Sequence, residues 1–176
     1  MRLILLDNYY PASQNDSVLR EYLTPDLVAT KLPGRTKRQV IEALLDIACR
    51  SGQVSDCELA KKDLLNHERE ISTGMENGLA IPHAKTAGVE DFVVAIGVSR
   101  KKIDFESLDK KPAQVFVLTL SPIGSIDPHL RFLTEICTIL KDKEVMHRVV
   151  SAKTDGDLYN VFAEAVGMET VDPSLD

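Results

Sequence analysis

Tryptophan is absent from this sequence of 176 residues, and aromatic residues of all kinds make up only 5% of it. A core built from this chain must therefore be largely aliphatic. Long apolar runs are missing too: the run Leu3–Leu6 ends at Asp7 and is too short for the apolar region of a signal peptide. No stretch approaches the roughly 20 apolar residues that span a bilayer. We therefore expect a cytoplasmic protein with no direct membrane insertion.

Cysteine and positive charge are also scarce. The three cysteines, at positions 49, 57 and 137, are odd in number and form no CxxC pair. This pattern predicts no disulfide framework and a reducing compartment. The formal net charge is −6 and the pI is near 5.3, which argues against nucleic acid as a partner.

What is present is the ordinary mixture of a globular protein, with 44% apolar and 27% charged residues. The length suits one well-cored domain. We predict a loose N-terminal extension over 1–20, in which Leu3–Leu6 offers an edge strand, a single domain over 21–168, and a flexible C-terminal tail over 169–176.

Helix and strand patterns alternate in the middle of the chain. Ser55 and Glu58 read as a capping box before one helix, and Asp127 reads as the N-cap of another, with Pro128 at its first position. The last strand is apolar on both faces, which is typical of a central strand covered by helices. These patterns predict a mixed sheet between helices, an α/β fold. The predicted helices cover 38–51, 56–67, 128–140, 143–151 and 155–166, and the predicted strands cover 79–81, 92–99 and 114–120.

Histidine offers the chemistry. His83 follows Pro82 and a short strand, so we expect it where the chain leaves the sheet. A neutral imidazole is a nucleophile that can take up a phosphoryl group and release it again. His129 lies in the first turn of a predicted helix, where free amides and the helix dipole favour anions. Taken alone, each histidine could also have no catalytic role. His83 would then be a polar residue at the end of a strand, and His129 a polar residue on an exposed first turn of a helix.

A charged cluster at 67–70 ends the helix before the turn. A cation at a helix C-terminus is stabilised by the dipole, so the cluster has a structural reading. Arg69 from this cluster would otherwise pair bidentately with a phosphoryl group. The sequence contains no phosphate-binding loop, no nucleophile elbow and no HExxH motif, and no ligand spacing suggests a metal site.

The segment 72–83, with the sequence STGMENGLAIPH, closely resembles the active-site segment of a known family. This is the enzyme IIA family of the bacterial phosphoenolpyruvate-dependent sugar phosphotransferase system, of the fructose, mannitol and nitrogen-regulatory type. In that family the histidine that ends the segment is phosphorylated, and here that position is His83. A second histidine, which is followed by spaced leucines at the start of a helix, assists it. His129, with Leu130 and Leu133, is similar to that second motif.

The segment before the turn departs from the family pattern. The family usually carries an Arg-Glu pair there, and its arginine supports the phosphoryl group. An ungapped match places His67 at the arginine, whereas Arg69-Glu70 recovers the pair if two residues are missing from the connection. From the resemblance we predict Arg69 as the supporting side chain, with His67 as the alternative, and Ser72 and Thr73 as further support.

The resemblance covers 22–167 and implies a three-layer α/β/α single domain with a mixed parallel and antiparallel sheet. It implies phosphoryl transfer from the phosphocarrier protein HPr, or its nitrogen-branch paralogue, onto His83. The phosphoryl group would pass to a IIB domain, or the phosphorylation state would be read by a regulatory target. No metal or organic cofactor is expected. The alternatives are a transport component, a regulatory module, which the lack of fused IIB or transmembrane IIC segments favours, and a degenerate IIA-like binding module without phosphotransfer.

Overall fold

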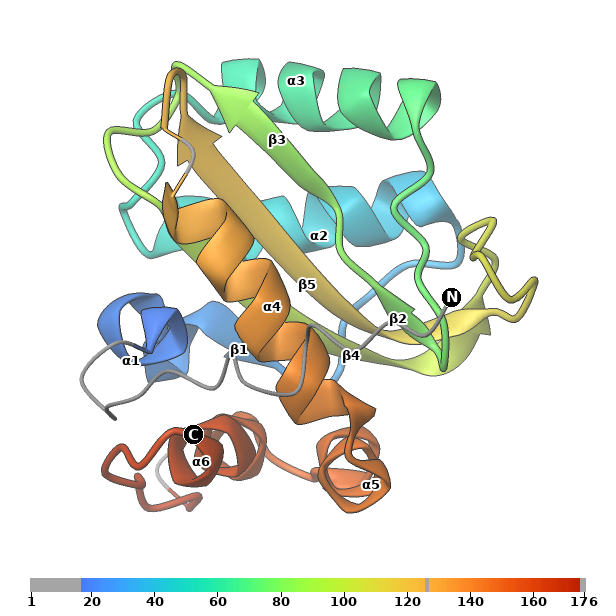
Figure 1. Cartoon of the computed structure of the whole chain (residues 1–176), viewed down its shortest axis with the longest axis vertical. Coiled ribbons are helices and arrows are strands. Elements are labelled where there is room, and N and C mark those ends of the chain that lie inside the picture. The colour runs from blue at the N-terminus through green and yellow to red at the C-terminus, as the bar shows by residue number, and fades with distance from the viewer. Residues whose placement is uncertain (1–16, 126, 175–176) are drawn as a thin grey trace, which may run out of the picture.

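The computed structural model of the chain describes residues 17–174 except residue 126 (Figure 1). The predicted edge strand at Leu3–Leu6 lies outside the described residues. Within the described part of the chain, no helix combines the length and apolar character needed to cross a bilayer.

A five-stranded sheet forms the centre of the fold (Figure 1). β5 lies at its middle, antiparallel to β4 on one side and parallel to β2 and β3 on the other, while β1 pairs in parallel with β4. The sheet is therefore mixed, as predicted. Its strands are β1 (Val28–Ala29), β2 (Leu79–Ala80), β3 (His83–Thr86), β4 (Val93–Ile103) and β5 (Ala113–Pro122).

β2 and β3 follow one another along the same edge of β5. Leu79 pairs with Val115, and four residues later His83 pairs with Thr119 in the same parallel sense. Pro82 lies at the break, and its carbonyl still accepts a hydrogen bond from Thr119 N–H at 3.0 Å. Proline lacks only the donor, so pairing resumes after it. The expectation that the chain leaves the sheet at His83 is wrong, because His83 begins the second half of an interrupted edge strand.

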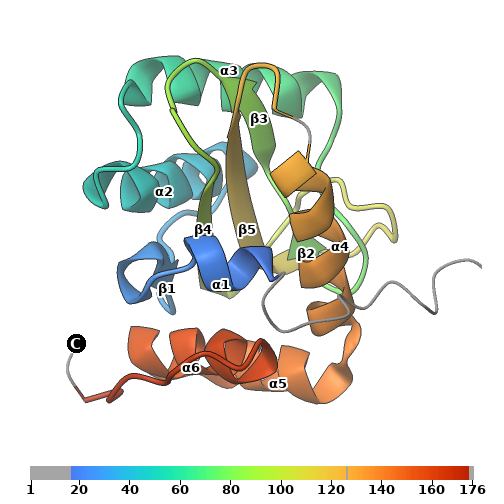
Figure 2. The ribbon, with the colours of Figure 1, turned by 60° about the vertical axis from the view of Figure 1, so that its left-hand side comes forward.

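Helices cover both faces of the sheet, which gives three layers (Figures 1 and 2). α2 packs on β4 and β5 and α3 packs on β3, while α4, α5 and α6 lie against the other face together with α1. The predicted three-layer α/β/α architecture is confirmed. The helices are α1 (Val18–Tyr22), α2 (Lys37–Arg50), α3 (Cys57–Glu70), α4 (Asp127–Lys141), α5 (Lys143–Ser151) and α6 (Asp155–Ala165), with a 3₁₀ turn at Pro25–Leu27.

The aliphatic core is split by the sheet into two clusters. β5 sends Val115 and Val117 toward the α4 to α6 side and Phe116 and Leu118 toward the α2 and α3 side. All four side chains are fully buried. The pattern of a strand apolar on both faces therefore identified the central strand correctly.

Local signals at the helix ends are partly as predicted. Thr154 and Asp157 form a complete capping box at the start of α6. At α3, however, the N-cap is Asp56, whose carboxylate accepts from Leu59 N–H at 2.9 Å, whereas Ser55 donates its hydroxyl to the carbonyl of Gly88. The helix is therefore capped by Asp56 alone, and the predicted capping box of Ser55 and Glu58 is wrong. The start of α4 also differs, since the helix begins at Asp127 itself.

The ends of the described chain are attached to the core. Val18 and Leu19 of α1 are buried, so the part of the predicted extension that the structure describes is packed. At the other end, the Asn160 side chain exchanges two hydrogen bonds with the backbone of Val171, each of 2.8 Å. Residues 171–174 therefore lie along α6.

A disulfide joins Cys49 and Cys57, which contradicts the prediction from the odd number of cysteines. Cys49 lies in the last turn of α2 and Cys57 begins α3, so the short connection between these helices brings their Cα atoms within 6.2 Å. An odd count excludes complete pairing only, and Cys137 is the free cysteine. Spacing along the chain did not reveal the pair, because the two residues meet through a turn between helices.

We expect reduction of this disulfide to lower the free energy of unfolding by about 2–3 kcal/mol, because the bond closes a short loop in the unfolded chain. Urea denaturation with and without dithiothreitol measures the difference, and intact mass under both conditions counts the thiols. The Cys49→Ser, Cys57→Ser double variant serves as the control and should not respond to the reductant. A wild-type protein with three free thiols before reduction would contradict the pairing.

Candidate functional site

His83 stands on the edge strand between two helix ends. It is the first residue of β3 and pairs with Thr119 of the central strand, so the sheet fixes its backbone. Its side chain is half-buried. Its ring contacts a histidine from the last turn of α3 and another from the first turn of α4.

A backbone carbonyl determines which ring nitrogen of His83 is free. The Nδ1 atom lies 2.8 Å from the carbonyl oxygen of Ile81. A carbonyl can only accept a hydrogen bond, so in the neutral ring Nδ1 carries the proton and Nε2 carries the lone pair. The ring nitrogen of His83 that has a free lone pair is therefore Nε2.

His67 faces that atom directly. It lies in the last turn of α3, and its Nε2 is 3.2 Å from Nε2 of His83, with 4.6 Å between the ring centroids. Since the His83 nitrogen carries the lone pair, His67 must supply the proton of this hydrogen bond. His67 therefore occupies the place beside the nucleophile that the ungapped match assigned to it.

His129 closes the other side. Its ring centroid lies 4.9 Å from that of His83, and its Nδ1 is 3.3 Å from the buried hydroxyl of Thr119. The residue lies in the first turn of α4, as predicted, where helix amides favour an anion. Three imidazoles thus lie in a row, with His83 in the middle.

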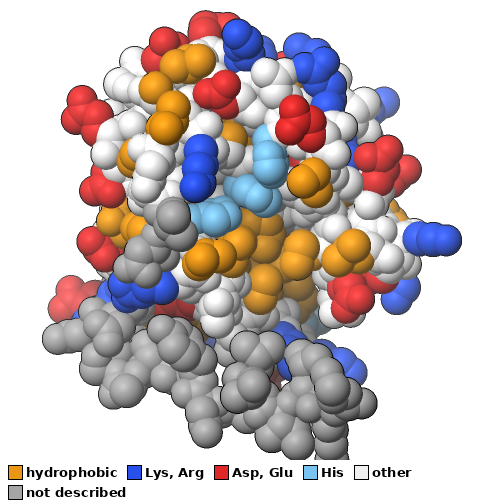
Figure 3. All heavy atoms as spheres, turned by 45° about the horizontal axis from the view of Figure 1, so that its top comes forward, with side chains coloured by type: hydrophobic (Ala, Val, Ile, Leu, Met, Phe, Trp, Pro, Cys, Tyr) orange, Lys and Arg blue, Asp and Glu red, His pale blue; other side chains and the backbone are white. Residues whose placement is uncertain are grey.

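These histidines line an open cleft of about 420 Å³. Figure 3 shows histidine side chains gathered on this face, with hydrophobic side chains beside them. Lys85, two residues after His83, adds a positive charge to the cleft, whereas Asp63 and Glu70 add negative charge. The cleft is lined by Asp63, Asn66, His67, Glu70, His83, Ala84, Lys85, Ser121 and His129.

The environment keeps the two predicted catalytic histidines neutral. Burial lowers the pKa of His83, and the neighbouring His67 lowers it further, although the Ile81 carbonyl and Glu68 act in the opposite direction. Burial, together with His83, Lys85 and His67, lowers the pKa of His129 to about 4. Both rings are therefore unprotonated at neutral pH, which is the state that a nucleophile and a neutral hydrogen-bond donor require.

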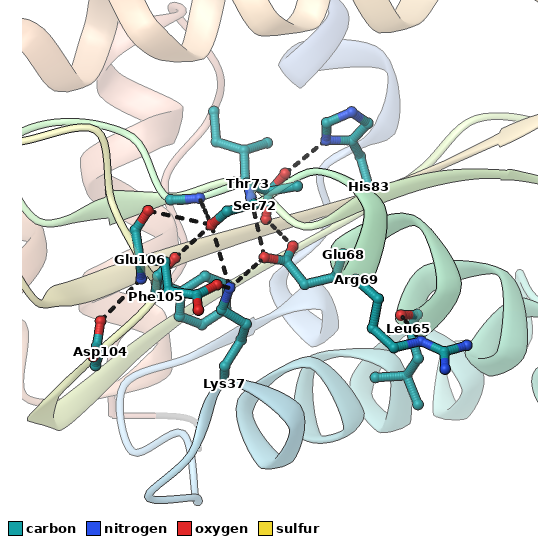
Figure 4. A network of polar contacts seen from close by, with 12 residues as sticks. Lys37, Leu65, Glu68, Arg69, Ser72, Thr73, His83, Asp104, Phe105 and Glu106 are labelled. Atoms are coloured by element: carbon teal, nitrogen blue, oxygen red, sulfur yellow. Dashed lines mark hydrogen bonds and ion pairs between the residues drawn. The ribbon is translucent and has the colours of Figure 1, made fainter. Parts of the chain in front are cut away.

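Arg69 lies elsewhere. Its guanidinium donates to the carbonyl of Leu65 and to the side chain of Asn66, and it lines a second cavity of about 690 Å³ between α2 and α3. Figure 4 shows Arg69 and His83 pointing in different directions. The structure thus brings His67, and not the preferred candidate Arg69, into contact with His83.

Ser72 and Thr73 lie behind the cleft. The Ser72 hydroxyl donates to the carbonyl of Phe105 at 2.6 Å, and both the backbone N–H and the hydroxyl of Thr73 donate to the carboxylate of Glu68 (Figure 4). Glu68 in turn pairs with Lys37 at 2.9 Å. From the sequence, Glu68 was expected only as one member of the charged cluster at 67–70, and no role was predicted for Lys37. They are 31 positions apart, and only the packing of α2 against α3 joins them.

Comparison with known proteins identifies the fold family. The sequence profile described as "Phosphoenolpyruvate-dependent sugar phosphotransferase system, EIIA 2" matches residues 21–165. The chain belongs to this EIIA 2 family. The resemblance carried by the segment 72–83 is thereby confirmed.

Two relatives in the family carry different descriptions. The chain is 36% identical over 145 residues to a "PTS system fructose-specific EIIA component" of Haloferax volcanii, a match that covers 82% of this chain and 94% of the relative. It is 30% identical over 146 residues to a "Nitrogen regulatory protein" of Pseudomonas aeruginosa, covering 83% and 95%. The EIIA 2 family therefore includes both sugar-specific and regulatory relatives of this chain.

Solved structures share the EIIA 2 fold. The nitrogen regulatory protein IIA-Ntr of Neisseria meningitidis superposes with a TM-score of 0.75 at 21% identity, over 82% of this chain and 99% of that one. The IIA component in a complex of mannitol-specific IIA with phosphorylated IIB of Escherichia coli gives a TM-score of 0.68 at 16% identity, covering 82% and 96%. At these identities the likeness shows the fold alone.

Metal ligation has little support in this EIIA 2 domain. Among residues 17–125 and 127–174, no group of three or more His, Cys, Asp or Glu side chains is arranged to hold a metal ion. That no metal or organic cofactor is needed stays an expectation from the family resemblance.

We expect the stability of the domain to fall as the pH drops from about 6.5 toward 4. The folded pKa of His129, about 4, lies below its ordinary value of 6.5, so the unfolded chain binds more protons across this range. After allowance for the exposed half of the ring, the loss from this residue is about 1–2 kcal/mol. Urea denaturation at pH 7 and pH 4.5 measures it, with His129→Gln as the comparison. Equal pH dependence in wild type and variant would contradict the shift.

Proposed function

We propose that the domain is a phosphoryl carrier of the phosphotransferase system, which accepts a phosphoryl group on Nε2 of His83. A single observation carries the proposal. The tautomer fixed by the Ile81 carbonyl presents the lone pair of His83 to an open cleft, between two further imidazoles. The proposed donor is HPr, or its nitrogen-branch paralogue, carrying a phosphohistidine.

The transfer needs little covalent machinery. The lone pair on Nε2 of His83 attacks phosphorus, the donor's N–P bond breaks, and its electron pair returns to the donor imidazole. The Nδ1 proton of His83 stays on its hydrogen bond to Ile81 throughout. The product is a phosphoramidate, and the reverse geometry passes the group to an acceptor nucleophile. Positioning and charge stabilisation therefore provide most of the catalysis.

We assign His67 and His129 the support of the phosphoryl oxygens. In the free protein the Nε2 proton of His67 occupies the lone pair of His83, so that hydrogen bond must open before attack. The same proton is then available to a phosphoryl oxygen. His129 approaches from the first turn of α4, where the backbone amides add to the field that favours an anion. In this proposal His67 takes the place of the family arginine beside His83.

Two candidates exist for the protein that interacts with the phosphorylated domain. The fold is shared with a IIA component that was solved with phosphorylated IIB, which supports a IIB domain as acceptor. The 30% identity to a nitrogen regulatory protein supports a second candidate function, in which a regulatory target reads the phosphorylation state. Both functions use His83 in the same way, and both place the domain in the cytoplasm. A IIA-like module that only binds partners would show no phosphorylation.

Incubation with phosphoenolpyruvate, enzyme I and HPr tests the central claim. We expect intact mass to show one acid-labile phosphoryl group on the wild type and none on His83→Ala, because no other nucleophile takes its place. His147→Ala, a histidine of α5, is the matched control and should be phosphorylated like the wild type. A wild type that stays unmodified, or a His83→Ala variant that accepts the group, would overturn the proposal.

A second comparison decides which residue supports the phosphoryl group. We expect His67→Ala to slow phosphorylation about tenfold, which corresponds to ~1.4 kcal/mol of transition-state stabilisation. Arg69→Ala should stay within about twofold of wild type, because its guanidinium faces the other cavity. Single-turnover rates with phosphorylated HPr measure both. The reverse ranking would return the supporting role to Arg69.

A further inference from the structure

The geometry points to Glu68 as a positioning residue for the phosphoryl acceptor, acting with Lys37 through the turn that carries Thr73 and the Ile81 carbonyl. This inference rests on the proposed function of His83. Neither side chain lines the row of three imidazoles, so the role is to hold the site rather than to touch the phosphoryl group.

Glu68 is a buried carboxylate with all its hydrogen bonds directed inward. It is 7% exposed, although both of its neighbours in sequence face clefts. Its Oε1 accepts from Thr73 N–H at 3.0 Å and from the Lys37 ammonium at 2.9 Å, while its Oε2 accepts from the Thr73 hydroxyl. A buried charge is tolerated only when it is paired and hydrogen-bonded, so this position requires a carboxylate.

Lys37 completes the arrangement from α2. It is the first residue of that helix, and its ammonium also reaches the exposed Glu106 at 2.7 Å and the Ser72 hydroxyl at 3.2 Å. Burial lowers the pKa of Lys37, but its hydrogen bonds to Glu106 and Glu68 raise it above the ordinary value. The ammonium therefore stays charged and ties the start of α2 to the end of α3 and to the turn after it.

The turn transmits this position to the nucleophile. The Thr73 carbonyl accepts from Ile81 N–H at 3.0 Å, and the Ile81 carbonyl accepts from Nδ1 of His83 at 2.8 Å. Gly74 packs so closely on the 105–107 loop that a Cβ there would lie 2.6 Å from the Phe105 carbonyl oxygen. The close contact at Gly74 therefore restricts the turn to one position. Through its hydrogen bonds to Thr73, Glu68 then fixes the position of the Ile81 carbonyl.

By fixing the Ile81 carbonyl, Glu68 controls which ring nitrogen of His83 carries the proton. If the Ile81 carbonyl moves, nothing requires the proton to stay on Nδ1 of His83, and a share of the molecules would carry it on Nε2. Those molecules have no lone pair at the attacking atom. Loss of Glu68 should therefore lower the rate of phosphoryl acceptance rather than the affinity for the phosphocarrier.

The test compares Glu68→Gln with Glu106→Gln, since both side chains pair with Lys37 but only the Glu68 side chain accepts hydrogen bonds from Thr73. With phosphorylated HPr as substrate, we expect Glu68→Gln to lower kcat at least fivefold, with KM within twofold of wild type. Two-bond ¹⁵N–¹H correlation spectra of the histidines should show the Nδ1–H tautomer of His83 in wild type and Glu106→Gln, and a mixture in Glu68→Gln. A folded Glu68→Gln protein with the wild-type tautomer and rate overturns the inference.

A second variant covers the case in which Glu68→Gln does not fold. Thr73→Val keeps the backbone hydrogen bonds but removes the hydroxyl that donates a hydrogen bond to Glu68. We expect it to raise the share of the Nε2–H tautomer of His83 and to lower kcat, both to a smaller degree than Glu68→Gln. A folded Thr73→Val protein with both readouts unchanged would also overturn the inference. The tautomer spectra need no phosphorylation, so a wild type that takes up no phosphoryl group would refute the carrier function and still leave the positioning role decided by the spectra.

Discussion

The hydrogen bond from His83 to the Ile81 carbonyl is the interaction on which the proposed chemistry depends, because it decides which ring nitrogen of His83 has a free lone pair. It exists because the edge strand is interrupted at Pro82. β2 ends before the proline and β3 begins after it, so the Ile81 carbonyl lies at the break between them. The imidazole two residues later can then reach back to it. Proline in an edge strand costs little, since only its missing donor is lost from the ladder.

Two helix ends converge on the nucleophile with different contributions. The end of α3 supplies His67, and the start of α4 supplies His129. Burial of the central and third rings keeps them unprotonated, so the charges of the cleft come from Lys85, Asp63 and Glu70.

Behind the histidines, the carboxylate of Glu68 joins elements that are distant in sequence. Its partners come from the start of α2 and from the turn after α3, and the turn leads directly to the Ile81 carbonyl. The buried ion pair is weak evidence for stability, since its desolvation offsets much of its attraction. We infer that the pair instead fixes the geometry of the turn. Because the Glu68 carboxylate bonds both Lys37 and Thr73, the turn has one arrangement, and the ring of His83 therefore has one position.

The sequence alone determined the features that arise from local periodicity and local chemistry. The alternation of apolar residues identified the central strand, helical spacing identified the main helices, and the segment 72–83 carried both the family and the central histidine. Tertiary structure decided the rest. α3 continues to Glu70, three residues beyond its predicted end, so His67 and Arg69 are about 200° apart around one helix and face opposite clefts. Which of them faces His83 depends on the phase of that helix against the sheet, and the pairing of Lys37 with Glu68, like that of Cys49 with Cys57, depends on how α2 packs against α3. The ungapped family match offered His67 as an alternative to Arg69. The other two contacts leave no trace in sequence spacing, because each joins residues through packing rather than along the chain.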